Sequence, residues 1–574
     1  MRITSLELTN FRSFRATQTI SFAPVTLLFG PNSVGKSTVL MALFYIQQIL
    51  EKGYCNPSRI NALGDRDIGG FAALVNGKDL RKSITFKVEC DVGKSIGTEY
   101  ETFADWDSNS LKLLMPDVAD DTRKIGVELE IGWSFIQNKA YVKRYSVWLN
   151  DEFVGQVESD DGLKQTAITA INFGHPLLKP LDHEDWVERS LDSGVPIHPS
   201  QLSQEQREHE DYYEDKNEDA YFTEFHYELN GMSAGLHKAS VVVNGEYACK
   251  PIGAGTFAGA IPHLGQVLLT NIDTPSESIN ESNYLNYLIV HRVLTQIFVS
   301  PLDKLLKLLK SSVCIGPLRT IPSANFIPNP YPEQANWVDG TAAWDLLYKC
   351  NNQLNSPVNY WLSAKERFNS GYGLASVVGK TYTEIKSGKN NDLEKMRMQL
   401  NSMIRNSDRD DGFDDVRYHQ GIVLYDLKNH ITLAPNQVGS GISQVIPVIT
   451  AAHHVTDGIV AVEQPELHIH PAFQVEVGDL FTQLDVSDSR RPTFLIETHS
   501  EHLVLRLLRR VKNTYSGDLG EGVKPVRVDD VSVLYLDHEN GEVTVHRCPI
   551  STDGDFEYGW PNGFFVEREE ELFS

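Results

Sequence analysis

Hydrophobic and polar positions alternate through the first residues of the chain, "MRITSLELTNF", as they do in a half-buried strand. After the loop "NFRSF", an unbroken apolar run, "PVTLLFG" (24–30), leads into "GKSTVLMALFYIQQILEKG", whose apolar positions recur at helical spacing. The pattern predicts a strand, a loop, a buried strand and a helix, in that order.

Period-two patterns continue in "KSITFKVEC", "IGVELEIGW" and "YVKRYSVWLNDEFVGQVES", where the "ND" pair at Asn150 and Asp151 is typical of a hairpin turn. These segments predict an antiparallel sheet. Residues 181–228 are rich in Asp, Glu and Gln and poor in aliphatic side chains. Such a composition favours a solvated insertion or acidic helix over a docking surface.

Helical spacing returns in "NYLNYLIVHRVLTQIFVSPLDKLLKLLKSS", "GTAAWDLLYKCNNQL" and "DLEKMRMQLNSMIRN", which predict a helical lobe or arm. The last part of the chain alternates: a hairpin ("GIVLYDLKNHITLA"), a helix ("SGISQVIPVITAAHHV"), a strand ("GIVAVEQ"), a helix, a strand ("PTFLIET"), a helix ("SEHLVLRLLRRVKN") and a final hairpin ("VSVLYLDHENGEVTVHRC"). Alternating strands and helices predict a mostly parallel sheet.

Charge, cysteine spacing and apolar run length indicate which kinds of protein this chain can be. The 574 residues carry a formal charge of −25, which opposes general attraction to nucleic-acid phosphates, so that any such contact must be local. Six cysteines without CxxC spacing indicate neither a zinc site nor a disulfide framework. The N-terminus lacks the apolar core of a signal peptide, and no apolar run reaches membrane-spanning length. We therefore expect a cytoplasmic protein with no membrane span.

The chemistry begins at "GPNSVGKST" (30–38), which fits G-x-x-x-x-G-K-[ST] between a predicted strand and a predicted helix. In such a P-loop, backbone N–H groups and the helix N-terminus surround phosphates, Lys36 reaches the β- and γ-phosphates, and Ser37 ligates Mg²⁺. The predicted cofactors are ATP and Mg²⁺. The predicted nucleotide-binding residues of the loop are Asn32, Ser33, Val34, Gly35, Lys36, Ser37 and Thr38.

A second apolar strand, "GIVAV", delivers Glu463, which we expect beside the P-loop strand as a metal ligand together with Ser37. One strand later, "FLIETHS" places His499 at the same edge of the sheet, where it can approach a γ-phosphate. "VGSGISQ" opens a further helix, and its small residues Ser440 and Gly441 allow close approach of an anion. A plain helix cap by Ser440 is an equally good interpretation.

These motifs, in this order and around a long insertion, resemble the ABC-type ATPase heads of the RecF, SMC and OLD group. "GPLR" (316–319) and "GWPNGFFVEREEELF" (559–573) further resemble a bacterial ATPase family with a C-terminal domain of unknown function, of which the Septu-type anti-phage ATPase is the nearest match. The resemblance implies an α/β fold: a P-loop mixed sheet with an antiparallel β subdomain and a long helical insertion.

The resemblance also implies a division of the chain. Residues 1–100 would form the N-terminal half of the head, 101–260 a β-rich lobe with the acidic insertion, 261–415 the helical insertion, 416–515 the C-terminal half of the head, and 516–574 a hairpin and tail.

The resemblance further implies a homodimer in which ATP lies between the P-loop of one head and Ser440-Gly441 of the other. Arg12 and Ser13 match the position at which the first hairpin contacts the nucleotide in this group, although an exposed turn explains an arginine equally well. No Q-loop glutamine stands out after the first helix, and Asp67 is assigned to that place by its position alone. Gln464 stands where the general base is usual, and glutamine is a poor base, so Glu466 is the predicted substitute and hydrolysis is expected to be slow.

Three functions fit these features: an ATP-gated dimer that controls a separate nuclease, for which the resemblance suggests an HNH type; an OLD-like nuclease; or a scaffold that binds ATP without turnover. A RecF- or SMC-like repair ATPase is the alternative to the first. Only about 75 residues follow His499, too few for an OLD-like nuclease domain.

Other clusters weigh less. The acidic group around Asp408 to Asp415 and the pairs His453-His454 and His468-x-His470 lack an accompanying metal motif. A basic face on the last long helix is a candidate for local nucleic-acid contact, although a solvated face is the simpler interpretation. It consists of Arg506, Arg509, Arg510 and Lys512.

Overall fold

The computed structural model describes residues 1–64, 66–100, 117–172, 174–178, 242–243, 246–247, 251–271, 281–323, 326–349, 352–382, 416–485, 491–539 and 542–560. The acidic segment 181–228, the predicted helix "DLEKMRMQLNSMIRN", the aspartate cluster at 408–415 and the tail after residue 560 lie outside these ranges. Within the described chain, no helix is both long and apolar enough to cross a membrane.

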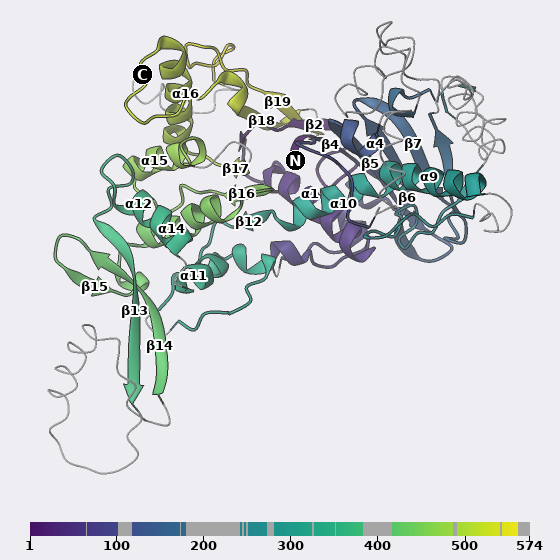
Figure 1. Ribbon diagram of the computed structural model, residues 1–574. Coiled ribbons are helices and arrows are strands. Elements are labelled where there is room, and N and C mark those ends of the chain that lie inside the picture. Colours follow the sequence, from purple (N-terminus) through teal and green to yellow (C-terminus); the bar gives the residue numbers. More distant parts are fainter. Residues whose placement is uncertain are drawn as a thin grey trace, which may run out of the picture.

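A six-stranded sheet forms the centre of the molecule, in the order β12-β16-β17-β3-β18-β19 (Figure 1). All neighbours are parallel except the last pair, which is the predicted C-terminal hairpin. Its strands are β3 (Val25–Phe29), β12 (Val313–Ile315), β16 (Ile459–Glu463), β17 (Thr493–Glu497), β18 (Val531–Glu539) and β19 (Glu542–Arg547). The predicted mostly parallel sheet is confirmed.

Every residue of β3, β16 and β17 is buried, because both faces of the sheet are covered. Val25 and Leu27 pack among helices on one face, and Leu28 packs towards an antiparallel sheet on the other. The helices of the first face are α11 (Thr341–Tyr348), α12 (Asn352–Ser363), α14 (Ser440–His454), α15 (Pro471–Thr482) and α16 (Glu501–Ser516).

The antiparallel sheet has eight strands, in the order β11-β8-β7-β6-β5-β4-β1-β2. Asn150 and Asp151 both adopt positive φ in the β6–β7 turn, as the sequence predicts for a two-residue hairpin. The sheet joins strands from both sides of residue 100. Its strands are β1 (Arg2–Thr9), β2 (Gln18–Ser21), β4 (Ile84–Asp91), β5 (Lys124–Ser134), β6 (Lys139–Leu149), β7 (Glu152–Ser159), β8 (Thr166–Ile171) and β11 (Ile252–Gly253).

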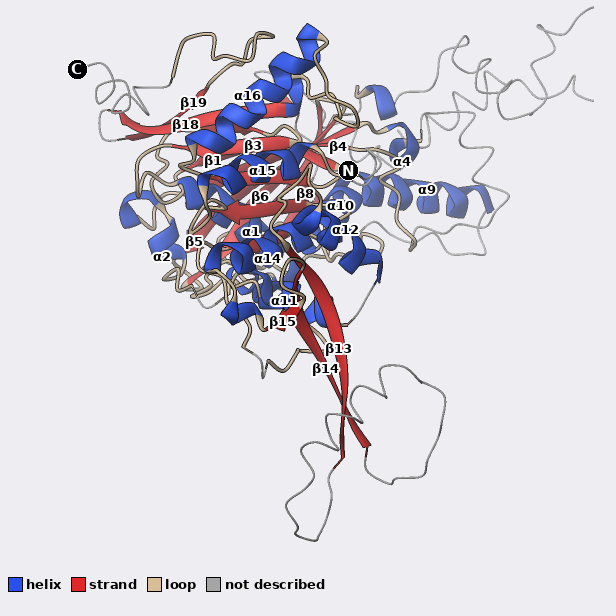
Figure 2. Ribbon diagram, turned by 90° about the vertical axis from the view of Figure 1, so that its left-hand side faces the viewer, coloured by secondary structure: helices blue, strands red, loops and turns tan. Residues whose placement is uncertain are grey.

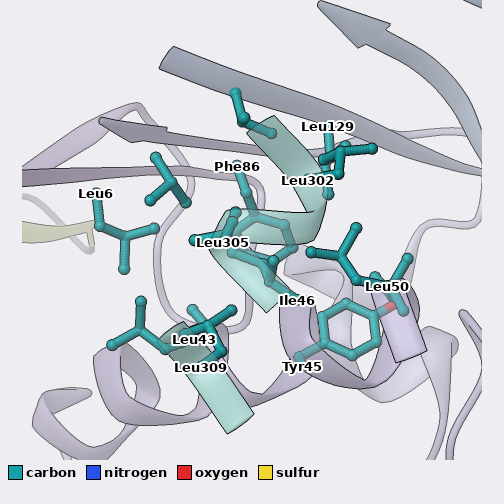
Figure 3. Packing of buried hydrophobic residues seen from close by; sticks show 14 of the residues in the cluster. Leu6, Leu43, Tyr45, Ile46, Leu50, Phe86, Leu129, Leu302, Leu305 and Leu309 are labelled. Atoms are coloured by element: carbon teal, nitrogen blue, oxygen red, sulfur yellow. The ribbon is translucent and has the colours of Figure 1, made fainter. Parts of the chain in front are cut away.

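Two helices fill the space between the sheets: α1 (Lys36–Lys52), which begins in the P-loop, and α10 (Ser300–Lys310). Leu302, Leu305 and Leu309 of α10 point into a cluster that also contains side chains of α1 and of the antiparallel sheet (Figure 3). Helix α9 (Glu281–Phe298) continues this layer along β7. The short helices α2 (Phe71–Leu74) and α4 (Val118–Asp121) border the antiparallel sheet.

A long hairpin projects from the body in both views (Figures 1 and 2). It pairs β13 (Tyr372–Tyr382) with β14 (Val416–Asp426), and the short strand β15 (Ile431–Leu433) pairs with the base of β14. The sequence predicts a helical insertion at 261–415. In the described part of this range, helices α9 to α12 pack against the two sheets, β12 forms an edge of the central sheet, and β13 begins the hairpin. A separate two-residue pair, β9 (Val242–Val243) and β10 (Glu246–Tyr247), completes the strands.

Candidate nucleotide-binding site

The P-loop connects β3 to α1 in a conformation that depends on its glycines. Gly30 and Gly35 have φ values of 136° and 116°, which side-chain-bearing residues rarely adopt. A Cβ on Gly30 would overlap the carbonyl oxygen of Leu536 in β18, so the loop lies directly against that strand. The predicted strand–loop–helix around residues 30–38 is therefore confirmed.

Lys36 lies at the start of α1 with its side chain buried. Its Nζ donates to the carbonyl oxygens of Gly30 (2.9 Å) and Pro31 (2.8 Å), so the ammonium folds back over its own loop. Burial lowers the Lys36 pKa, and the charges of Glu497 and Glu466 oppose this shift. The Lys36 ammonium thus interacts electrostatically with the carboxylates of Glu497 and Glu466, while its hydrogen bonds go to the two loop carbonyls.

The strand beside the P-loop strand is β17, not β16, which corrects one expectation. In register, Glu497 pairs with Leu28, whereas Glu463 on β16 lies one strand further away. Accordingly the Ser37 hydroxyl donates to Glu497 Oε2 at 2.8 Å, and Lys36 Nζ lies 3.9 Å from Glu497 Oε1. We did not single out Glu497 from the sequence. Glu497 ends the apolar strand "FLIE" just as Glu463 ends "GIVAVE", and the two are register partners. An acid at the end of an apolar strand was therefore the signal for both residues.

Glu463 makes a different contact. Both of its carboxylate oxygens accept from Arg66, at 3.1 Å from Nη1 and 2.9 Å from Nη2, in a bidentate pair. The Glu463 side chain is buried, while the Arg66 side chain is 37% exposed. Hydrogen bonding to Glu463 is the main cause of the raised Arg66 pKa. The neighbouring Asp67 is exposed and accepts the Gly69 N–H at 2.9 Å.

Glu466 lies in the turn after β16 and is held at the end of β17. Its carboxylate accepts from Thr498 Oγ1 (2.8 Å) and from the backbone N–H of His499 (2.7 Å). Burial raises the Glu466 pKa, with these hydrogen bonds acting in the opposite direction. A carboxyl with a raised pKa, near the P-loop lysine, has the properties of a general base.

His499 reaches the same region through the β17–α16 turn. Burial lowers its pKa, and the positive charge of Lys36 lowers it further, so the neutral imidazole is favoured. The structure thus brings Lys36, Ser37, Glu463, Glu466 and His499 to one edge of one sheet.

Arg12 and Ser13 lie in the β1–β2 loop next to the P-loop. Arg12 has a positive φ of 49°, and its Nη1 lies 3.0 Å from Met41 Sδ in α1. Burial and then the charge of Arg66 lower the Arg12 pKa, which places the two guanidinium groups near each other. A Cβ on Gly35 would meet the Ser13 hydroxyl. This loop therefore packs onto the P-loop.

Ser440 is the first residue of α14, and Gly439 precedes it as the N-cap without a side-chain cap hydrogen bond. The interpretation of Ser440 as a helix cap does not hold, because Gly439 takes the N-cap position and no side chain caps this helix; the Ser440 side chain is exposed. Gly441 lies close to the backbone of the segment after Glu466, since an added Cβ would meet the His468 carbonyl oxygen at 2.7 Å. The helix N-terminus faces solvent.

Arg319, in "GPLR", is, after Glu497 and Arg66, the third residue that sequence reasoning did not place in the site. Its side chain is buried, and Nη2 donates to the carbonyl oxygens of Glu463 (3.1 Å) and Gln464 (3.0 Å). Burial lowers its pKa to about 10, with the charge of Glu466 opposing the shift. Arg319 fixes the backbone that carries both acids.

Half of the basic face proposed on α16 forms ion pairs inside the protein. Arg510 donates to both carboxylate oxygens of Asp479 on α15, at 2.7 and 2.6 Å, and Arg506 pairs with Glu476 and Asp479. Arg509 and Lys512 are exposed. Two of the four cations therefore hold α16 to α15.

The histidine pairs also have packing roles. His453 lies 6.4 Å from Trp361, ring to ring, and His454 stacks on Trp337 at 5.4 Å. His470 caps α15 by accepting from the Ala472 N–H. Among the described residues, no group of three or more His, Cys, Asp or Glu side chains has the arrangement of a metal site.

Comparison with protein families matches the AAA ATPase domain to residues 1–56 and 329–504. The match joins the segments that hold the P-loop and the Glu463–His499 edge. It supports an AAA ATPase domain in these two segments, which contribute strands to the mixed sheets described above. No curated protein matches the sequence.

Solved structures similar to this chain include SMC heads. The head domain from Thermotoga maritima has 10% identity and a TM-score of 0.33, with 96% of this chain and 100% of that chain covered. The Smc head with an extended coiled coil derived from Pyrococcus furiosus, bound to the C-terminal domain of ScpA, has 9% identity, full coverage of both chains and a TM-score of 0.32. We transfer no residue role from likenesses of this degree.

Proposed function

We propose that this protein binds ATP with Mg²⁺, hydrolyses the ATP slowly, and uses the nucleotide to gate association of two heads. The observation that carries the proposal is the convergence of a P-loop with acids from the far end of the chain: Ser37 and Glu497, 460 positions apart, are hydrogen-bonded. Glu463 and Glu466 lie at the same edge. A P-loop that faces buried acids at a sheet edge suits a metal-bound triphosphate.

The residues present fit Mg²⁺, which prefers oxygen ligands. The Ser37 hydroxyl and the Glu463 carboxylate are the ligands expected from the sequence. When bound, the metal would neutralise charge on the β- and γ-phosphates. Lys36 would move from the Gly30 and Pro31 carbonyls to phosphate oxygens, and the N–H groups of residues 32–38 would surround the phosphates.

Glu466 is the residue we assign as general base. Gln464, with a positive φ of 46°, is held by the hydrogen bond from its N–H to the Glu497 carbonyl at 2.7 Å. Because an amide does not take up a proton at neutral pH, Gln464 is assigned no proton transfer. Neutral His499 would donate towards the γ-phosphate. Slow turnover would leave the ATP-bound form long-lived.

The proposed partner is a second copy of the chain. The exposed Ser440 at the start of α14 supports this part, because a helix N-terminus is favourable for an anion such as the γ-phosphate of ATP on the other head. The small Gly441 follows it. A further role in the cytoplasm, controlling a separate nuclease in anti-phage defence, is supported by the sequence resemblance of residues 316–319 and 559–573. Co-purification with the product of a neighbouring nuclease gene tests that role.

The test of the ATPase assignment compares Lys36→Ala, Glu466→Gln and the control Lys52→Ala at the exposed end of α1. We expect Lys36→Ala to abolish ATP binding in calorimetry and Lys52→Ala to leave it unchanged. Glu466→Gln should bind ATP but hydrolyse it about 10²- to 10⁴-fold more slowly in a single-turnover assay. Unchanged ATP affinity in Lys36→Ala would refute the nucleotide site. Unchanged hydrolysis in Glu466→Gln would remove Glu466 from the role of base.

A further inference from the structure

Two glutamates end neighbouring parallel strands at this edge of the sheet. Glu463 on β16 and Glu497 on β17 are direct register partners. They are only 5% and 8% exposed. Two adjacent buried carboxylates need a cation, because their mutual repulsion and desolvation are otherwise uncompensated.

The cation that meets this need in the structure is Arg66. Its guanidinium binds both oxygens of Glu463, and its charge also acts on Glu497. Lys36 lies 3.9 Å from Glu497, but it donates to loop carbonyls instead. Arg66 therefore supplies the positive charge that binds Glu463 in a bidentate pair and also acts on Glu497.

Arg66 and the two acids lie on different kinds of backbone element. Glu463 and Glu497 belong to the central sheet, whereas Arg66 lies on a surface loop and is 37% exposed. Gly64 and Gly69 on either side of it have positive φ values of 68° and 74°. The acids are fixed by the sheet, and the arginine can leave them without disturbing a strand or a long helix.

We propose that Glu463 and Glu497 form a carboxylate pair that holds the metal together with Ser37, and that Arg66 is the cation which the metal displaces. The proposal rests on the proposed function and adds to it a second acid and a competing internal cation. Mg²⁺ carries twice the charge of a guanidinium and takes oxygen ligands, so it and Arg66 compete for the same carboxylate oxygens. The Ser37–Glu497 hydrogen bond sets the hydroxyl and the second acid side by side for one ion.

The competition predicts opposite effects for two substitutions. Glu497→Gln removes a ligand and should weaken metal binding. Arg66→Ala removes the competitor and should strengthen it. If Arg66 is instead a permanent structural partner of Glu463, its removal leaves a buried carboxylate unpaired, which lowers the melting temperature without tightening metal binding.

The experiment measures Mn²⁺ binding to the full chain by electron paramagnetic resonance, with the non-hydrolysable ATP analogue AMP-PNP. We expect Glu497→Gln to weaken Mn²⁺ binding about 10- to 100-fold, in the range for loss of a group that positions a metal. AMP-PNP binding in EDTA should be retained. Arg66→Ala should bind Mn²⁺ more tightly than the wild type. The matched control, Asp67→Asn, removes an exposed carboxylate next to Arg66 and should match the wild type.

Equal Mn²⁺ affinity in Glu497→Gln and the wild type would exclude Glu497 as a ligand, and unchanged or weaker binding in Arg66→Ala would exclude displacement. Either result leaves the proposed ATPase function intact if the wild type binds AMP-PNP with Mn²⁺. Failure of the wild type to bind AMP-PNP at all would overturn both. Circular dichroism checks folding, and the Arg66→Ala measurement stands even if Glu497→Gln does not fold.

Discussion

At the scale of single residues, the most informative side chain outside the P-loop is Arg319. Its guanidinium is buried and donates to backbone carbonyl oxygens of its own turn, of α14, of the last residue of β16 and of the residue after it. These are Gly316, Gln444, Glu463 and Gln464. No carboxylate takes part in these hydrogen bonds. Arg319 therefore holds these backbone segments together, because their buried carbonyl groups would lose a hydrogen-bond donor without it.

We expect Arg319→Met to lower the free energy of unfolding by about 3 to 5 kcal/mol, because methionine fills the space but donates no hydrogen bond. Urea denaturation measures this change. The adjacent Leu318 is 73% exposed, so Leu318→Ala should change stability by less than about 0.5 kcal/mol. Similar losses in both variants would contradict the role assigned to the guanidinium.

The sequence identified the residues of this site that belong to a local motif. Lys36 and Ser37 follow from the spacing of the P-loop, and Glu463 and Glu466 follow from the apolar strand that precedes them. Arg66 and Arg319 could not be found in this way, because their roles depend on contacts with residues 397 and 144 positions away. Nothing in the local pattern of "GDRDIGG" or "GPLRT" specifies such contacts.

At the scale of elements, helices α15 and α16 are joined by a buried ion-pair network. Asp479 is 1% exposed and binds Arg510 through both oxygens, and Arg506 joins the same carboxylate. Gly478 lets the helices approach, since a Cβ there would lie 3.1 Å from the Arg506 side chain. The helix that follows His499 is thereby anchored to the helix that follows Glu466.

We expect Asp479→Asn to destabilise the protein by about 3 kcal/mol, because it leaves two largely buried guanidinium groups short of negative charge. The melting temperature should fall, and high salt should not restore it fully, since buried pairs are weakly screened. The exposed Arg509 provides the control: Arg509→Ala should change stability by less than about 0.5 kcal/mol. Equal melting temperatures for wild type and Asp479→Asn would show that the network contributes nothing.

Most helices and strands could be predicted from the periodicity of apolar residues, but which strands lie side by side in the central sheet could not. The hairpin at Asn150-Asp151, the helix after the P-loop and the final hairpin all lie where the pattern places them. The order of the central sheet was not predictable in the same way, since uniformly apolar strands such as β3, β16 and β17 fit beside one another in any order. The placement of Glu463 next to the P-loop strand was wrong for this reason.

At the scale of the whole molecule, two cores share the central sheet. One contains α1, α10 and the antiparallel sheet, and the other contains α11, α12 and α14 to α16. The P-loop and the start of α14 belong to different sides of this sandwich. In the proposed dimer, each head would offer its P-loop to the other head's α14.

We expect Ser440→Arg to prevent the ATP-dependent dimer while leaving ATP binding to the single chain unchanged, because the added side chain would extend from the exposed helix start into the partner head. Light scattering with AMP-PNP and Mg²⁺ measures the mass, and calorimetry measures binding. Tyr515→Arg, at the exposed far end of α16, is the control and should dimerise normally. A Ser440→Arg protein that dimerises like the wild type would exclude this face.

The position of β3 also bears on how the protein is made. Its two neighbours in the sheet are β17 and β18, so the strand that leads into the P-loop pairs only with residues synthesised more than 460 positions later. During synthesis, β1 and β4 of the antiparallel sheet can pair early, whereas the strand before the P-loop can pair only after β17 and β18 have been made. The nucleotide site proposed above would therefore be complete only once β17 and β18 have been synthesised.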